Sequence, residues 1–184
     1  MRRCVALACI AIGLLACERG ERRVVIDERL LAALGLAQAY QHQADELASL
    51  GRRREAIARV HAILEIPFPA GVPEREDVRL DAHGRIAELL LEEGDEAGAL
   101  ERIGEGLAEA SRASYFKARL HAVAGRVHRE QARRLREAGD QDGARAASRA
   151  AIVDFERSIE INRLVLGLGA SDATDAGARR GDGG

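Results

Sequence analysis

The sequence has few aromatic residues and few prolines. Its 184 residues include no tryptophan, two tyrosines and three phenylalanines, so aromatics make up 3% of a chain that is 47% hydrophobic. A core of Leu, Ile, Val and Ala suits close-packed helices better than a β-sandwich or barrel. Pro67, Pro69 and Pro73 lie within one seven-residue stretch, which leaves long segments on either side free to be helical. The composition predicts an all-α protein.

The chain also lacks a large charge of either sign. It has 28 basic and 30 acidic residues, for a formal net charge of −2. The hydrophobic fraction argues against a chain that is disordered throughout. The charge balance, together with the absence of basic segments interleaved with aromatics, argues against a nucleic-acid partner.

The first residues have the pattern of an export signal. Arg2 and Arg3 precede a run from 4 to 15 that is apolar or small, and charged residues follow from Glu18. A basic start followed by a short apolar run is typical of a secretory signal. The run is shorter than the roughly 20 apolar residues that a membrane-spanning helix needs.

The end of this segment, Leu14-Leu15-Ala16-Cys17, resembles the lipobox of a bacterial lipoprotein precursor. The resemblance implies cleavage before Cys17, thioether lipidation of that cysteine and acylation of the new amino terminus with a fatty acid such as palmitate. We therefore expect a signal peptide at 1–16, a lipidated cysteine and tether at 17–26, and a domain that faces the periplasm. The alternatives are an ordinary secretory signal in which Cys17 is incidental, or a buried first helix.

Processing at this site would change the cysteine count and the charge. Cys4 and Cys9 would be removed, and Cys17 would be the only cysteine left. Arg2 and Arg3 would also be lost, leaving 26 basic and 30 acidic residues. The processed chain could then form neither a disulfide framework nor a cysteine-based metal site.

Beyond the tether, apolar residues recur at the three- and four-residue spacing of amphipathic helices. Glycines and prolines interrupt the pattern, and Asp27 is a suitable cap for the first helix. The predicted helices span residues 27–50, 53–66, 73–93, 95–110, 114–138 and 142–166. They define a helical domain at 27–166. Residues 167–184, rich in Gly, Ala, Asp and Ser, are expected to be disordered.

Three of the predicted turns share one pattern, a glycine followed five residues later by an alanine. The pairs are Gly51 and Ala56, Gly94 and Ala99, and Gly139 and Ala144. Residues 37–160 thereby resemble degenerate tetratricopeptide repeats, although the glycines are 43 and 45 residues apart and the family period is about 34. The resemblance implies three antiparallel helical hairpins stacked as a short solenoid. The alternative is an irregular six-helix bundle.

In tetratricopeptide proteins, the first helices of successive hairpins line a groove that binds peptides. The resemblance places these polar residues on the groove face: Gln41, Asp45, Glu88, Glu92, Arg126, Arg129, Arg133 and Arg136. The spacing of the four arginines puts them on one helical stripe. They could grip an acidic segment or a C-terminal carboxylate of a partner. Alternatively they pair with the acidic helix beside them, with Asp81 and Glu88 level with Arg126 and Arg133.

The histidines do not have the spacing of a metal site. His121 and His128 are seven residues apart, about 10 Å along a helix, which is too far to share one ion. His61 lies on an apolar stripe and is expected in the core. We therefore predict that the chain binds no metal.

No motif predicts catalysis. Gly104-Glu105-Gly106 lacks the third glycine and the preceding strand of a dinucleotide-binding loop, and no serine lies in a nucleophile elbow. We expect a non-catalytic protein without a cofactor. The alternative is a ligand-binding or hydrolytic helical bundle, which a deep pocket with converging histidine and carboxylate groups would favour.

Together these patterns predict a membrane-anchored envelope lipoprotein that acts as a protein–protein interaction or scaffold module. Its partner would be another envelope protein or peptide. A second copy of the chain is a further candidate, because no helix follows to cover the apolar end of the last one. The residues at that end are Ile161, Leu164, Val165 and Leu166.

Overall fold

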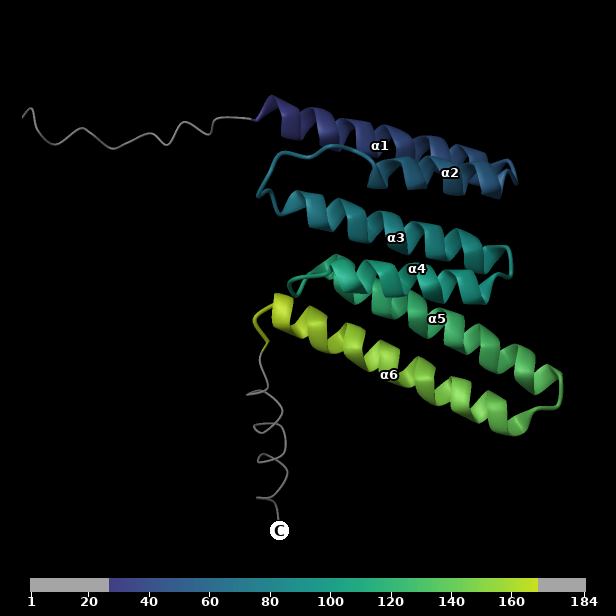
Figure 1. Ribbon diagram of the computed structural model, residues 1–184. Helices are drawn as coiled ribbons and strands as arrows, with labels where there is room; N and C mark the ends of the chain where they lie inside the picture. The colour runs from purple at the N-terminus through teal and green to yellow at the C-terminus, as the bar shows by residue number, and fades with distance from the viewer. Residues whose placement is uncertain (1–26, 169–184) are drawn as a thin grey trace, which may run out of the picture.

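The computed structural model describes residues 27–168, which form six α-helices (Figure 1). The helices are α1 (Glu28–Ser49), α2 (Arg53–Leu64), α3 (Glu74–Glu92), α4 (Glu96–Glu109), α5 (Tyr115–Glu137) and α6 (Gln141–Val165). This part of the chain contains no strand, so the all-α prediction is confirmed. Each helix begins and ends within two residues of its predicted position. The predicted signal peptide, the tether and residues 169–184 of the predicted tail lie outside the described residues.

Aspartates explain where three of the helices begin. The Asp27 carboxylate accepts hydrogen bonds from the backbone N–H groups of Arg29 and Leu30, at 2.9 and 3.3 Å. Asp95 and Asp140 each accept one from the backbone N–H three residues later, at 2.9 and 2.8 Å. These bonds satisfy N–H groups of the first helical turn that have no partner within the helix.

Glycines end α1, α3 and α5. Gly51, Gly94 and Gly139 have φ angles of 75, 83 and 85°, in the left-handed region that a side chain disfavours. Each glycine reverses the chain within a few residues, so the next helix returns beside the one just ended. The three glycine turns lie at the same end of the helix stack (Figure 1).

The helices are arranged in two layers. α3 contacts both α1 and α5, α2 packs against α1 and α3, and α4 packs against α3 and α5. Among the described helices, α6 contacts only α5, and α2, α4 and α6 do not contact one another. Consecutive helices run in opposite directions, so the first residues of α1 and the last of α6 lie at the end opposite the glycine turns (Figure 1).

Two apolar clusters hold the layers together. The first lies among α1, α2 and α3 and includes the fully buried Val60 and Ile63. The second lies among α3, α4 and α5 and includes the fully buried Leu120 and Val127. Because α3 contributes to both clusters, the first two hairpins and α5 form one continuous core.

His61 is exposed, so the prediction that it lies in the core is wrong. The buried residues of α2 are Ala56, Val60 and Ile63. His61 follows Val60 by one residue, about 100° around the helix, and therefore lies outside this face.

A glycine lets α6 approach α5 closely. A Cβ atom at Gly125 would lie 2.8 Å from the ring of Phe155, so a side chain there would require this ring to move. Ile161 is buried against α5, which contradicts its predicted place in an uncovered apolar end. It lies three residues after the buried Ser158, on the same side of α6, whereas residues 164–166 are exposed as expected.

Candidate functional site

The layer of α1, α3 and α5 carries a row of interacting polar side chains, which we call the polar ladder. Its members are Gln41 and Asp45 on α1, Asp81, Arg85 and Glu88 on α3, and Arg119 and Arg126 on α5. Between α1 and α3, the Gln41 amide donates to Asp81 at 2.5 Å and Arg85 donates to Asp45 at 2.8 Å. We call the surface that these three helices share the α1–α3–α5 face.

Glu88 is the centre of the ladder between α3 and α5. Its carboxylate accepts hydrogen bonds from Arg119, at 2.9 Å, and from Arg126. Arg119 also donates to Asp81, and Arg85 lies 3.7 Å from Glu88 on the same helix. The Glu88 side chain is only 16% exposed, so its charge interacts with the three guanidinium groups through little water.

The polar ladder shows how α3 and α5 are aligned. Asp81 pairs with Arg119 and Glu88 with Arg126, and both pairs are 38 residues apart in sequence. The predicted alignment, with Asp81 and Glu88 level with Arg126 and Arg133, is therefore wrong by seven residues. It followed the 45-residue interval between turn glycines. With partners 38 residues apart, α5 begins three residues later than α3 and is four residues longer, so it extends seven residues beyond the end of α3.

The predicted groove residues do not all join the ladder. Gln41, Asp45, Glu88 and Arg126 do. Glu92 instead accepts a hydrogen bond from Arg53 of α2, at 3.2 Å. The predicted alternative, in which the arginines pair with the neighbouring acidic helix, holds in this structure for Arg126.

The other three arginines of the row differ from Arg126. Arg133 pairs with Glu130 and Glu137 on its own helix, and these carboxylates raise the pKa of its guanidinium. Arg129 and Arg136 are exposed, and neither forms an ion pair within residues 27–168. Arg129 and Arg136 thus present their guanidinium groups to solvent. Arg133, which lies between them, is paired with carboxylates of its own helix.

Sequence reasoning missed three members of these networks. Arg85 and Arg119 lie on the ladder stripe, and Arg119 is seven residues before Arg126, so extending the arginine row by one heptad would have found it. Arg134 of α5 pairs with Glu96, the first residue of α4, whose side chain is 7% exposed. This last pair is also 38 residues apart, but Glu96 lies on α4, so the pair forms only because α5 extends past the end of α3.

A second polar cluster lies inside the second hairpin. The Arg79 guanidinium donates twice to the Glu109 carboxylate, at 2.6 and 2.8 Å, and thereby lowers the pKa of Glu109. His83, which is 2% exposed, places Nε2 at 3.3 Å from Glu109, and its Nδ1 has no hydrogen-bond partner within the described residues. Burial lowers the pKa of His83 despite the nearby carboxylates of Glu109 and Glu105.

The side chains of His121 and His128 both lie near the carboxylate of Asp154 on α6. Asp154 lies 2.8 Å from Nδ1 of His128 and 3.6 Å from Nδ1 of His121. The seven-residue separation is bridged because Asp154 faces α5 between the two rings. Burial lowers the pKa of His121. Within residues 27–168, no group of three or more potential ligands has the geometry to hold a metal ion.

These histidines make stability depend on pH. Because the pKa values of His83 and His121 are lower in the folded chain, the unfolded chain binds more protons as the pH falls below about 6.5. Their contribution to stability is present above this pH and is lost as the pH falls toward their folded pKa values. We expect the melting temperature to drop by about 3–6 °C between pH 7.5 and 5.5.

The measurement is thermal unfolding of the full chain across this pH range. His83→Gln should flatten the slope of melting temperature against pH, whatever it does to the absolute stability. His42→Gln, at an exposed position on α1, is the matched control and should leave the slope unchanged. An identical slope in wild type and His83→Gln would contradict the assignment.

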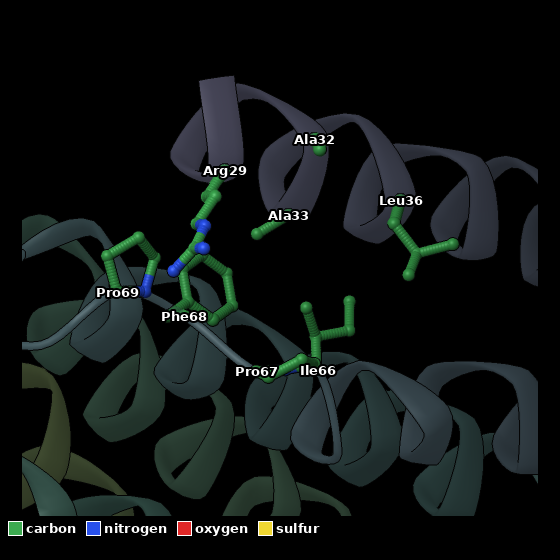
Figure 2. A pocket seen from close by; sticks show the side chains of 8 residues that line it. All are labelled: Arg29, Ala32, Ala33, Leu36, Ile66, Pro67, Phe68 and Pro69. Atoms are coloured by element: carbon green, nitrogen blue, oxygen red, sulfur yellow. The ribbon is translucent and has the colours of Figure 1, made fainter. Parts of the chain in front are cut away.

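An apolar cavity lies beside the first turns of α1 (Figure 2). Its volume is about 460 Å³, and it is lined by Arg29, Ala32, Ala33, Leu36, Ile66, Pro67, Phe68 and Pro69. It occupies the space that α2 leaves because α2 is ten residues shorter than α1 and continues as an extended connection. Within residues 27–168, no histidine or carboxylate lines this cavity. It therefore lacks the converging groups by which a hydrolytic pocket would be recognised.

A second cavity, of about 690 Å³, opens between the connection to α3 and the loop after α4. Its polar lining residues are Arg75, Glu76, Arg79, Glu109, Ser111 and Arg112. Four of them bind one another, because Glu109 accepts hydrogen bonds from Arg79 and Glu76 accepts one from Ser111. Arg112 pairs at 2.6 Å with Asp77, which does not line the cavity. These contacts join α3 to the end of α4.

No family model, curated protein or solved structure matches the chain. Residues 27–168 contain no helix with both the length and the apolar character that crossing a membrane requires.

Proposed function

We propose that this chain is a lipid-anchored protein of the bacterial cell envelope, and that its helical domain is a short tetratricopeptide-like solenoid that acts as a non-catalytic scaffold. The lipobox-like segment that ends at Cys17 supports the anchor. The tether at 17–26 has ten residues, and a segment of that length spans at most about 35 Å. The two-layer order of the helices supports the solenoid.

The α1–α3–α5 face is the observation that carries the scaffold role. Three helices run in the same direction, and the polar ladder fixes their alignment. The charges of the ladder are paired with one another, so they hold the face in shape. A partner would then be bound by the groups that the ladder leaves free.

Arg129 and Arg136 are those free groups. They lie on one stripe of α5, seven residues or about 10 Å apart. Guanidinium groups bind carboxylates in bidentate geometry, and two of them at this spacing suit a segment with several carboxylates. The partner we propose is an envelope protein that presents an acidic segment or an acidic C-terminus to this part of the face.

The proposal is tested by photo-crosslinking in intact cells, with a photoreactive side chain placed in the full chain at the exposed Arg133, which lies between the two free arginines. We expect a discrete adduct with one envelope protein, and Arg136→Glu should reduce its yield about tenfold by reversing one of the two charges. Arg149→Glu, at an exposed position on α6, is the matched control and should leave the yield unchanged. The same photoreactive group at the exposed Arg59 on α2 should give no such adduct.

Two outcomes would contradict separate parts of the proposal. If Arg136→Glu and Arg149→Glu give equal yields, these arginines do not recognise the partner. Cys17→Ala should release the chain from the membrane fraction and lower the adduct yield. A Cys17→Ala chain that remains quantitatively in that fraction would show that the anchor assignment is wrong.

A further inference from the structure

The last helix has a stripe of exposed apolar residues that nothing in residues 27–168 covers. Ile152, Ile159 and Leu166 follow one another at intervals of seven, and their side chains are 55, 60 and 71% exposed. Residues seven apart lie on the same side of a helix, so Ile152 and Ile159 form one line along α6, and Leu166, the C-cap residue directly after α6, continues it. Isolated exposed aliphatic residues are common, but a line of three along an end helix is the pattern of an interface.

Two charges interrupt this stripe at complementary places. Glu156 lies three residues before Ile159 and Arg163 four residues after it, both on the exposed side. Neither forms an ion pair within the described residues, whereas Arg157 and Glu160, further round the helix, pair with each other. The stripe is therefore apolar at its centre and at both ends, with one acidic and one basic group between.

We propose that a second copy of this chain covers the stripe, with the two α6 helices antiparallel and crossing at Ile159. A twofold axis at this residue places Ile152 opposite Leu166 of the other copy, because both are seven residues from the centre. It also brings Glu156 next to Arg163 of the other copy, since they lie about 4.5 and 6 Å from the centre along the helix. The same patch thus complements itself, as a twofold interface requires.

Other occupants fit the stripe less well. The C-terminal residues 169–184 contain no Leu, Ile, Val, Met or Phe, so they have no large apolar side chain to place against it. A parallel arrangement of two α6 helices would put Glu156 and Arg163 of the two copies on opposite sides of the contact, so neither charge would meet an opposite one. The charge pattern thus favours a second copy in the antiparallel orientation.

The first test is the mass of the full chain in detergent solution, measured by sedimentation equilibrium. We expect dimer formation, which Ile159→Glu should weaken at least 100-fold by burying two carboxylates at the centre. Val153→Glu is the matched control, because Val153 is equally exposed at 62% but lies on a different side of α6. It should change the dissociation constant less than about threefold. A monomeric wild-type chain, or equal effects of the two substitutions, would overturn the proposal.

Charge reversal tests the orientation. Glu156→Arg and Arg163→Glu should each weaken the dimer about tenfold, because each places like charges together. The double variant restores both contacts and should return the dissociation constant close to that of the wild type. A double variant weaker than either single one would exclude the antiparallel crossing.

A cysteine at the axis gives an independent readout. Ile159→Cys should form a disulfide between two copies, because the twofold axis brings the two cysteines together. Residues 27–168 contain no other cysteine, and mass spectrometry identifies the disulfide by its linked peptides. Val153→Cys should not form one. Equal linkage at both positions would show that the α6 helices meet at random.

Discussion

Gly106→Val is expected to lower the free energy of unfolding by about 3 kcal/mol. Gly106 is buried in α4, where the helix meets α3 and α5. A Cβ atom there would lie 2.9 Å from the Cβ of His83 and 2.9 Å from a methyl group of Leu120. The first of these contacts is with an atom bonded directly to the α3 backbone, so it cannot be relieved by rotating a side chain.

Valine would add two more carbons to a site that has no room for the first. α4 must then move away from α3, which opens the second apolar cluster around the fully buried Leu120. The gain in helix propensity over glycine is a few tenths of a kcal/mol and does not offset this.

The matched control is Gly104→Val, two residues earlier on the same helix. Gly104 is exposed, and nothing lies within 4 Å of the position that its Cβ would take. Its unfolding free energy should change by less than about 0.5 kcal/mol. Urea denaturation of the two variants measures the difference, and equal losses would contradict the described packing of α4.

Glu88→Ala is expected to lower the free energy of unfolding by about 2 kcal/mol. It removes the acceptor that Arg119 and Arg126 share, and hydrogen bonds to charged groups contribute about 1.5–3 kcal/mol each when buried. Arg126 is 43% exposed, so solvent screens its part and the sum is smaller than two buried bonds would give.

Glu92→Ala is the control for this substitution. Glu92 lies one turn later on α3, is half-exposed and has a single contact, with Arg53. Its loss should cost less than about 0.5 kcal/mol. If urea denaturation gives equal losses for the two variants, the ladder does not hold α3 and α5 together. A double-mutant cycle of Glu88→Ala with Arg126→Ala isolates the part of the effect that belongs to that pair.

The positions of the helices could be predicted from sequence because their boundaries are local. Asp95 and Asp140 cap helices through bonds to a residue three positions later, and Gly94 and Gly139 end helices through their own backbone angles. None of these interactions depends on the rest of the fold. The all-α class followed from the same local signals.

The alignment of helices and the contacts across them could not be predicted in the same way. The interval between turn glycines measures the length of two helices and a connection, whereas alignment depends on where neighbouring helices touch. Because α5 extends beyond the end of α3, the glycine interval and the alignment of the two helices differ. Glu88 therefore pairs with Arg126 and not with Arg133, which the glycine interval had placed level with it. The prediction that His61 lies in the core was wrong for a related reason. In a helix of only 12 residues, such as α2, the sequence defines the apolar stripe poorly.

The placement of the start of α1 and the end of α6 at one end of the helix stack has a consequence for the shape of such a dimer (Figure 1). Ile159 lies only six residues, or about 9 Å, before the end of α6, whereas the start of α6 lies about 27 Å from it. In an antiparallel pair that crosses at Ile159, the ends of the two α6 helices therefore lie close to the twofold axis. Measured along α6, the ends of the two copies from which the tethers leave lie near the middle of the dimer, and the glycine turns lie at its two far ends.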